Sequence, residues 1–200
     1  MHIAIPQLEA ARPTAQIELD EALTRLVARK QAWAELGIPD KIQLLDGLVE
    51  KTALVAERWV AAACRAKGID AGSPLAGEEW TSGPWALMYG ARHYAMTLVQ
   101  ILTAGAPQIP GKVRTRPDGQ VIAEVFPQTI WDKLLLGGVQ GEVWMEPGVT
   151  SASLAANMGA FYKEQAPHGR VALVLGAGNI ASIGTWTCCT SSTPRVRSAS

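Results

Sequence analysis

The segment Gly176-Ala177-Gly178-Asn179-Ile180-Ala181 has the residue types and spacing of a turn that approaches a phosphate. It matches the pattern G-x-G-x-x-G/A and directly follows residues 170–175, an almost continuous apolar run typical of a strand buried in a parallel sheet. Glycines allow a tight turn and close approach of the backbone to a ligand. The N-terminus of a following helix presents N–H groups to phosphate. The sequence therefore predicts a strand, a ligand-facing turn and a helix.

Two alternatives stay open for this turn. Dinucleotide-binding turns also use an Asp or Glu roughly 20 residues further on to bind the ribose hydroxyls, but no acid follows Glu164. A glycine-rich turn without a ligand is therefore the competing interpretation. Asn179 is equally open, because its amide suits either hydrogen bonding to a developing oxyanion or capping of a helix.

The other reactive side chains predict no metal centre. His93 lacks a partner at metal-ligand spacing and is interpreted as a packed or capping residue, while His2 and His168 suit a terminus and a loop. Cys64 lies in an apolar helical stretch and is predicted to be a core residue. The adjacent Cys188 and Cys189 lack metal-ligand spacing. Surface or salt-bridged roles are expected for Asp132, Lys133 and Glu142.

Helices are predicted to dominate the first half of the chain. The first extends from Ala15 to Leu36, and the second from an N-cap at Asp40 to Lys67, closed by Gly68. A third is expected from Thr81 to Ala104. The predicted core face of the second helix comprises Leu45, Leu48, Val49, Val55, Trp59 and Ala63. That of the third comprises Trp85, Met88, Tyr89 and Met96.

The pattern changes to strands after Pro110. Residues 112–116 and 120–126 are predicted to form a hairpin around the turn Pro117-Asp118-Gly119. A further strand is expected at 141–145 and a helix at 151–165. The predicted fold class is α/β: N-terminal helices, a β-hairpin region and the first strand of an incomplete Rossmann-like domain.

Composition excludes several classes of partner. The 200 residues carry 18 Lys and Arg against 18 Asp and Glu, so the formal net charge is zero. This balance argues against a nucleic acid or an anionic membrane as the main partner. No apolar run has the length of a membrane span, and the N-terminus has no signal-peptide layout. A cytoplasmic location is therefore expected.

The segment GRVALVLGAGNIASI at 169–183 resembles the NAD(P)-dependent aldehyde dehydrogenase family, in a divergent bacterial branch. The resemblance covers residues 17–183 and includes FPQTIWDKLLLGGVQGEVWMEP at 126–147. It implies that Gly176, Ala177, Gly178 and Asn179 bind NAD or NADP, and that Asn179 belongs to the oxyanion hole. Family members commonly have Pro-Trp before this Asn, where this sequence has Ala-Gly.

The resemblance also implies a reaction. In the family a cysteine thiolate attacks an aldehyde, hydride passes to NAD(P), and a glutamate-activated water or another acceptor releases the acyl group. That cysteine and glutamate lie far downstream of the matched region, so Cys188 and Cys189 are too early for the role. The full-length parent is expected to act on a small aldehyde or acyl substrate and to be a homo-oligomer.

The last residues differ in character from the rest of the chain. From Thr185 the sequence reads TWTCCTSSTPRVRSAS, with no helical period and a bias toward strand and turn formers. We expect a frameshift near codon 185. In the shifted frame, Trp186 followed by Thr187 specifies Asp, and Cys188 followed by Cys189 specifies Leu.

The expected organisation follows from these two interpretations. Residues 1–110 are the helical region of the cofactor domain, 111–148 the hairpin region, 149–184 the start of the NAD(P)-binding unit and 185–200 an out-of-frame tail. The leading hypothesis is an inactive N-terminal part of an aldehyde dehydrogenase-like oxidoreductase. The alternatives are a small nucleotide-binding module without catalysis and a helical interaction protein.

Overall fold

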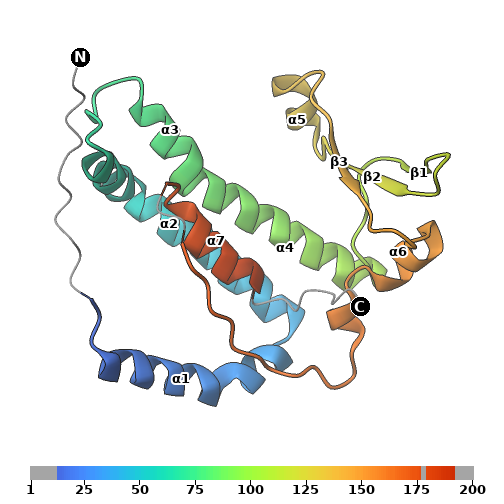
Figure 1. The fold of residues 1–200 in the computed structure, drawn as a ribbon, viewed down its shortest axis with the longest axis horizontal. Coiled ribbons are helices and arrows are strands. Elements are labelled where there is room, and N and C mark those ends of the chain that lie inside the picture. The colour runs from blue at the N-terminus through green and yellow to red at the C-terminus, as the bar shows by residue number, and fades with distance from the viewer. Residues whose placement is uncertain (1–12, 177–178, 192–200) are drawn as a thin grey trace. The chain divides into compact units, whose positions relative to one another are not determined.

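The computed structural model describes residues 13–176 and 179–191 (Figure 1). The chain divides into two compact units, one containing residues up to Met96 together with those from Gln165 to Arg195, the other containing Thr97–Glu164. Both helices and strands are present, so the predicted mixed α/β class is confirmed at that level. None of the helices in the described ranges is long and apolar enough to cross a membrane.

The first two helices form where they were predicted. α1 spans Gln16–Glu35 and α2 spans Ile38–Lys67. The predicted N-cap at Asp40 is wrong, because α2 begins at Ile38 after an extended Gly37. Pro39 fits this first turn, where its missing N–H removes no helical hydrogen bond. Gly68 ends the helix in the left-handed conformation, with φ of 67°.

The buried face of α2 is close to the predicted one. Leu45, Val49 and Cys64 are buried, which confirms the core role of Cys64. Val55 is exposed instead, while Leu48, Trp59 and Ala63 are only partly buried. The observed face is completed by Thr52, Ala56 and Val60.

A kink replaces the start of the predicted third helix. The segment consists of α3 (Ala76–Trp80), the π-helical turn η1 (Thr81–Trp85) and α4 (Ala86–Ala104). Gly83 has non-helical angles, with φ of −99° and ψ of −109°, and Pro84 lacks an N–H, so one straight helix cannot form. The predicted core stripe is wrong for Trp85 and Met96, which are exposed, while Met88 and Tyr89 are partly buried. The fully buried residues are Leu87, Ala91, Leu98 and Ile101.

The second unit contains the predicted hairpin. β1 (Val113–Thr115) pairs antiparallel with β2 (Val121–Phe126), with Arg114 opposite Ile122. β3 (Gly141–Trp144) joins the other edge of β2, giving the order β1-β2-β3. α5 (Ile130–Leu135) connects β2 to β3. The helix predicted at 151–165 is divided into α6 (Ser151–Asn157) and the 3-10 turn η2 (Ala160–Lys163), because Gly159 adopts φ of 65° between them.

The predicted buried strand at 170–175 does not form. Residues 170–176 belong to no sheet, and the side chains of Leu173 and Leu175 are 87% and 81% exposed. An apolar run becomes a buried parallel strand only where other strands pair with it and helices cover both faces of the sheet. The three strands in the described part of the chain pair only with one another.

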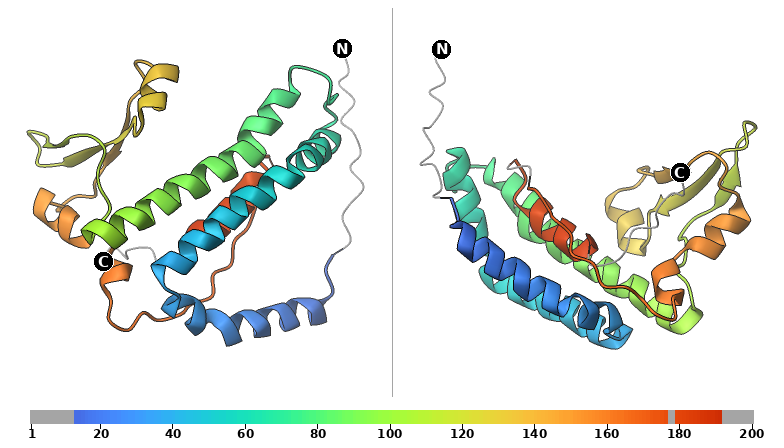
Figure 2. Two further views of the ribbon diagram at one scale, coloured as in Figure 1. Left: turned by 180° about the vertical axis from the view of Figure 1, so that it is seen from behind. Right: turned by 60° about the horizontal axis from the view of Figure 1, so that its bottom comes forward.

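α7 (Ser182–Ser191) follows the glycine turn and runs alongside the first part of α4 (Figures 1 and 2). It includes the first residues of the segment predicted to lack helical character. Residues 185–191 are therefore helical despite their strand and turn bias, and residues 192–200 lie outside the described ranges.

Candidate functional site

The glycine turn lies between the extended segment 170–176 and α7. Gly176 ends the extended segment, and a Cβ built there would meet no atom within 4 Å. Asn179 is exposed, while Ala177 and Gly178 lie outside the described residues. Because α7 begins at Ser182, its N-cap position is Ala181 rather than Asn179. Asn179 is therefore not the N-cap of α7.

Gln31 holds the chain just before the extended segment. Its Nε2 donates a hydrogen bond to the carbonyl of Pro167 at 3.0 Å, and its Oε1 accepts one from the N–H of Gly169 at 3.1 Å. A Cβ at Gly169 would lie 2.2 Å from the carbonyl oxygen of Lys30, so only glycine fits this approach to α1. One amide side chain and one glycine therefore fix the start of the segment.

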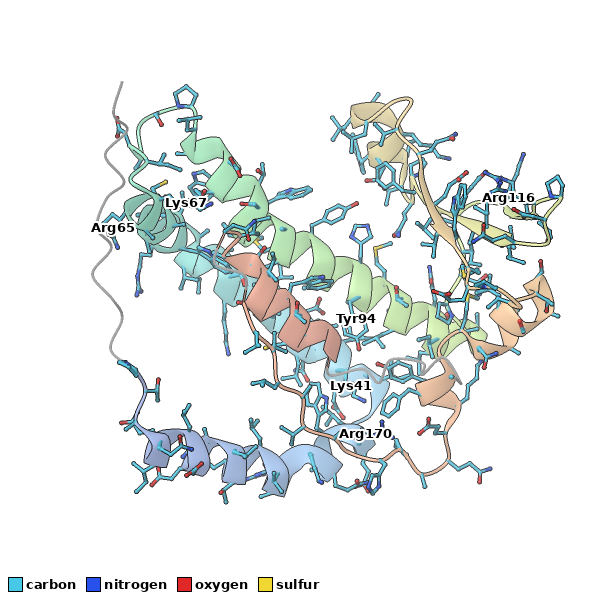
Figure 3. The ribbon with its side chains drawn as sticks, in the orientation of Figure 1. Lys41, Arg65, Lys67, Tyr94, Arg116 and Arg170 are labelled. Atoms are coloured by element: carbon cyan, nitrogen blue, oxygen red, sulfur yellow. The ribbon has the colours of Figure 1, made fainter. Side chains whose placement is uncertain are left out.

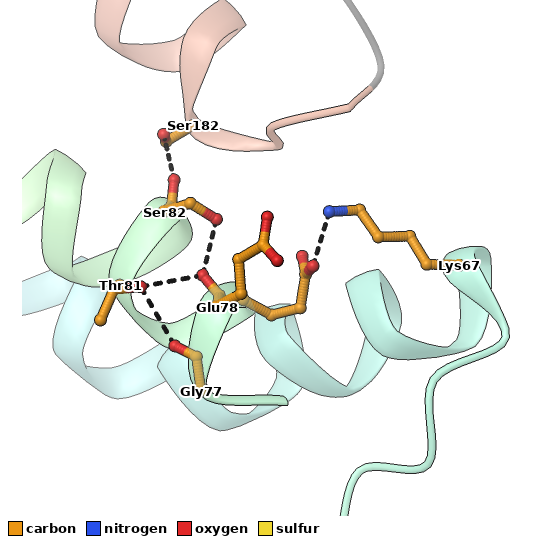
Figure 4. A network of polar contacts seen from close by, with 7 residues as sticks. Lys67, Gly77, Glu78, Thr81, Ser82 and Ser182 are labelled. Atoms are coloured by element: carbon orange, nitrogen blue, oxygen red, sulfur yellow. Dashed lines mark hydrogen bonds and ion pairs between the residues drawn. The ribbon is translucent and has the colours of Figure 1, made fainter. Parts of the chain in front are cut away.

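Ser182 holds the other side of the turn. It is buried, and its hydroxyl donates a hydrogen bond to the carbonyl of Ser82 (Figure 4). The acceptor Ser82 lies next to the Gly83 kink, where the N–H of Ala86 bonds to the carbonyl of Gly83. This contact fixes the first residue of α7.

Trp186 of α7 makes an apolar contact with α4. A Cβ at Gly90 would lie 2.6 Å from the Trp186 ring, so the indole occupies the space above this glycine of α4. Two separate contacts, one polar and one apolar, therefore dock α7 against the helices that precede it.

The two cysteines of α7 differ in exposure. Cys188 is exposed and Cys189 is half-buried. Burial raises the pKa of the Cys189 thiol, and the neighbouring Cys188 raises it further. A nucleophilic cysteine requires the opposite shift. The raised pKa of the Cys189 thiol is therefore not that of an activated nucleophile.

The described residues fit NAD or NADP only in part. The open space at Gly176 and the N-terminus of the ten-residue α7 suit a phosphate group. No Asp or Glu occurs between Glu164 and Ser200, the stretch in which a dinucleotide-binding turn would have its ribose-binding acid. The extended segment also has no neighbouring strand to complete a dinucleotide-binding unit among the described residues.

The remaining candidates have structural surroundings. The Nδ1 of His93 donates to the carbonyl of Tyr89 at 2.9 Å, and no group that could hold a metal ion occurs among residues 13–176 and 179–191. His168 is exposed, and His2 lies outside the described residues.

The acids near the sheet have structural roles as well. Asp132 is buried in a capping box with Thr129, so its predicted surface role is wrong. Glu142 pairs with Arg114 at 2.5 Å, as the salt-bridged alternative predicted. Hydrogen bonds from Trp144 and then Arg114 lower the pKa of the Glu142 carboxyl.

Two buried charges escaped prediction from the sequence. Glu79 is 1% exposed and pairs with Lys67 at 2.5 Å (Figure 4). Lys41 is buried near the ring of Trp33, with its Nζ 5.9 Å from the ring centroid, and burial lowers its pKa (Figure 3). For Lys41 the sequence contained a signal: it lies four residues before Leu45, on the same face of α2 as the buried residues.

Comparison of the chain with protein-family models, with curated proteins and with solved structures found no match.

Proposed function

We propose that the chain is the N-terminal part of an aldehyde dehydrogenase-like oxidoreductase. The full-length form would oxidise an aldehyde, or reduce an activated acyl group, with NAD or NADP. The observation that carries this proposal is the segment at 169–183, in which Gly176 ends an extended segment and exposed Asn179 precedes α7. The order of extended segment, glycine turn and helix is the one that the resemblance implies, although the segment 170–175 is not paired as a strand among the described residues.

The 200-residue chain alone is proposed to lack turnover. By resemblance, the nucleophilic cysteine and the glutamate that activates water lie beyond the matched segment. The raised pKa of Cys189 gives no substitute nucleophile. The absence of an acid after Glu164 leaves the ribose without its usual partner.

Two measurements test these statements. The purified chain is incubated with an aliphatic aldehyde and NAD or NADP, and reduced cofactor is followed by absorbance; we expect no turnover. Thermal unfolding is then measured with and without NAD, for the wild type and for Gly176→Val. A Cβ at Gly176 meets no atom within 4 Å, so the valine is expected to occupy the open space at the turn and to block ligand approach.

The outcomes separate the competing hypotheses. Turnover by this chain would overturn the proposal of inactivity. Saturable stabilisation by NAD that Gly176→Val removes would support the nucleotide-binding module instead. The family assignment has its own test, which is the coding DNA beyond codon 185. A shifted frame that continues into a segment with the family cysteine and glutamate supports the assignment, and its absence contradicts it.

A further inference from the structure

Residues 130–139 form a strongly apolar surface in the second unit. They comprise α5 and the loop that follows it, and they lie beyond the ends of β2 and β3 (Figure 1). We call this segment the α5 tip. Large apolar side chains that are between 50% and 76% exposed make up most of it: Ile130, Trp131, Leu134, Leu135, Leu136 and Val139. An exposed apolar patch of this density marks an interaction surface.

The α5 tip presents no negative charge to solvent. Its single acid, Asp132, is buried, and the carboxylate accepts hydrogen bonds from the N–H groups of Gln128 and Thr129 at 3.0 Å and 2.8 Å. Lys133 is exposed and is the only other charged residue of the segment. The outer surface of the tip therefore combines apolar side chains with one positive charge.

The backbone at both ends of α5 is hydrogen-bonded locally. At the start, the N–H of Asp132 bonds to the Thr129 hydroxyl at 3.1 Å. At the end, the N–H of Leu136 bonds to the carbonyl of Asp132, and the N–H of Val139 bonds to the carbonyl of Leu136. An apolar medium provides no water to satisfy backbone groups, so a segment that enters lipid must pair them itself. A protein partner would supply hydrogen-bonding groups of its own, so these local bonds favour lipid.

A phospholipid bilayer suits this combination of side chains. Tryptophan and leucine side chains enter the boundary between headgroups and acyl chains, and a lysine beside them reaches a headgroup phosphate. Selective binding to anionic lipid needs a cluster of basic residues, whereas the α5 tip has one lysine and the whole chain has a formal net charge of zero. The chemistry therefore indicates a zwitterionic phospholipid surface.

We propose that the α5 tip inserts into the surface of a phospholipid bilayer, with its apolar side chains at the edge of the acyl chains and Lys133 at the headgroup phosphates. The attraction comes from removal of apolar surface from water. The proposal uses residues of the second unit alone and does not depend on the proposed oxidoreductase activity.

Sedimentation of the full chain with phosphatidylcholine vesicles tests this proposal. We expect the wild type to bind, with little change when salt is raised or phosphatidylserine is added. Leu134→Glu places a charge in the tip and is expected to weaken binding about tenfold or more. Leu134 is 70% exposed, so the variant should keep the thermal unfolding of the wild type. Leu54→Glu is the matched control, because Leu54 is 83% exposed on α2 and lies outside the tip.

Quenching of tryptophan fluorescence locates the contact. Brominated phosphatidylcholine quenches indole rings that enter the bilayer, so it should quench the wild type. Trp131→Phe keeps an apolar ring in the tip and should retain binding while removing most of the quenching. Trp80→Phe is the matched control, because Trp80 is 42% exposed on α3 and should leave the quenching unchanged.

Each of several results would overturn the proposal. These are no binding to phosphatidylcholine vesicles, binding only when phosphatidylserine is present, equal losses in Leu134→Glu and Leu54→Glu, and quenching that Trp131→Phe leaves unchanged. A dimer that forms without lipid and dissociates in Leu134→Glu, measured by light scattering, would assign the α5 tip to a second copy of the chain instead.

Discussion

The hairpin of β1 and β2 and the extended segment 170–176 are both rich in apolar and β-branched residues, but only the hairpin is paired. In the hairpin, Val121, Ile122 and Ala123 are buried and bonded to a neighbouring strand. In the segment 170–176, Leu173 and Leu175 are exposed and no strand lies alongside among the described residues. Similar composition therefore leads to two different outcomes.

The difference lies in the distance along the chain to the partner. The turn at Gly119, which has φ of 87°, brings β2 directly beside β1. An antiparallel partner is therefore supplied locally, whereas a parallel strand needs a crossover connection. The segment 170–176 depends instead on contacts at its two ends, made by Gln31 before it and by α7 after it.

The largest effect is expected from Gly169→Ala. The new Cβ would lie 2.2 Å from the backbone oxygen of Lys30, so α1 or the 167–169 segment must move. We expect a loss of about 1–3 kcal/mol in the free energy of unfolding, measured by urea denaturation. Hydrogen exchange should quicken around residues 167–169 and stay unchanged in the hairpin. Gly176→Ala is the control, since its Cβ meets open space; equal losses in the two variants would refute the role of Gly169 as an anchor.

A smaller loss of stability, in the unit that contains the hairpin, is expected from Gly119→Ala. Alanine in the left-handed conformation costs about 1–2 kcal/mol, and the loss should appear as faster exchange in β1 and β2. The segment 167–169 should keep its exchange rates. Gly137→Ala is the matched control, because its Cβ would make only an ordinary contact of 3.5 Å with the carbonyl of Lys133. Exchange that quickens equally in both units would contradict the separation of the two regions.

The smallest effect concerns thiol reactivity on α7 rather than stability. Because burial and the neighbouring Cys188 raise the pKa of the Cys189 thiol, less Cys189 thiolate is present at neutral pH, and its alkylation should begin at a higher pH in the folded chain than in the urea-unfolded chain. Mass spectrometry after iodoacetamide treatment at several pH values measures the two Cys189 profiles. Trp186→Ala removes the ring that packs on Gly90 and should bring the folded Cys189 profile closer to the unfolded one. Identical profiles for the folded and unfolded wild type would show that α7 is not docked.

Local patterns predicted much of the fold. Gly68 ends α2, the turn at Gly119 defines the hairpin, and helix-forming residues followed by the stop at Gly37-Ile38-Pro39 place α1 close to its observed bounds. These features depend on residues a few positions apart. The kink at Gly83 had a local signal in the adjacent Pro84, but periodicity across the whole stretch predicted one continuous helix.

The sequence by itself determined the approximate bounds of α1 and α2, the end of α2 at Gly68 and the hairpin turn at Gly119. Only the tertiary structure decided which face of α4 is buried, that Glu79 and Lys41 are buried, and that residues 170–176 remain unpaired. The physical reason is that backbone preferences and turn chemistry act over a few residues. Burial and strand pairing depend on which distant segments, such as Gln31 and Trp186 here, come into contact.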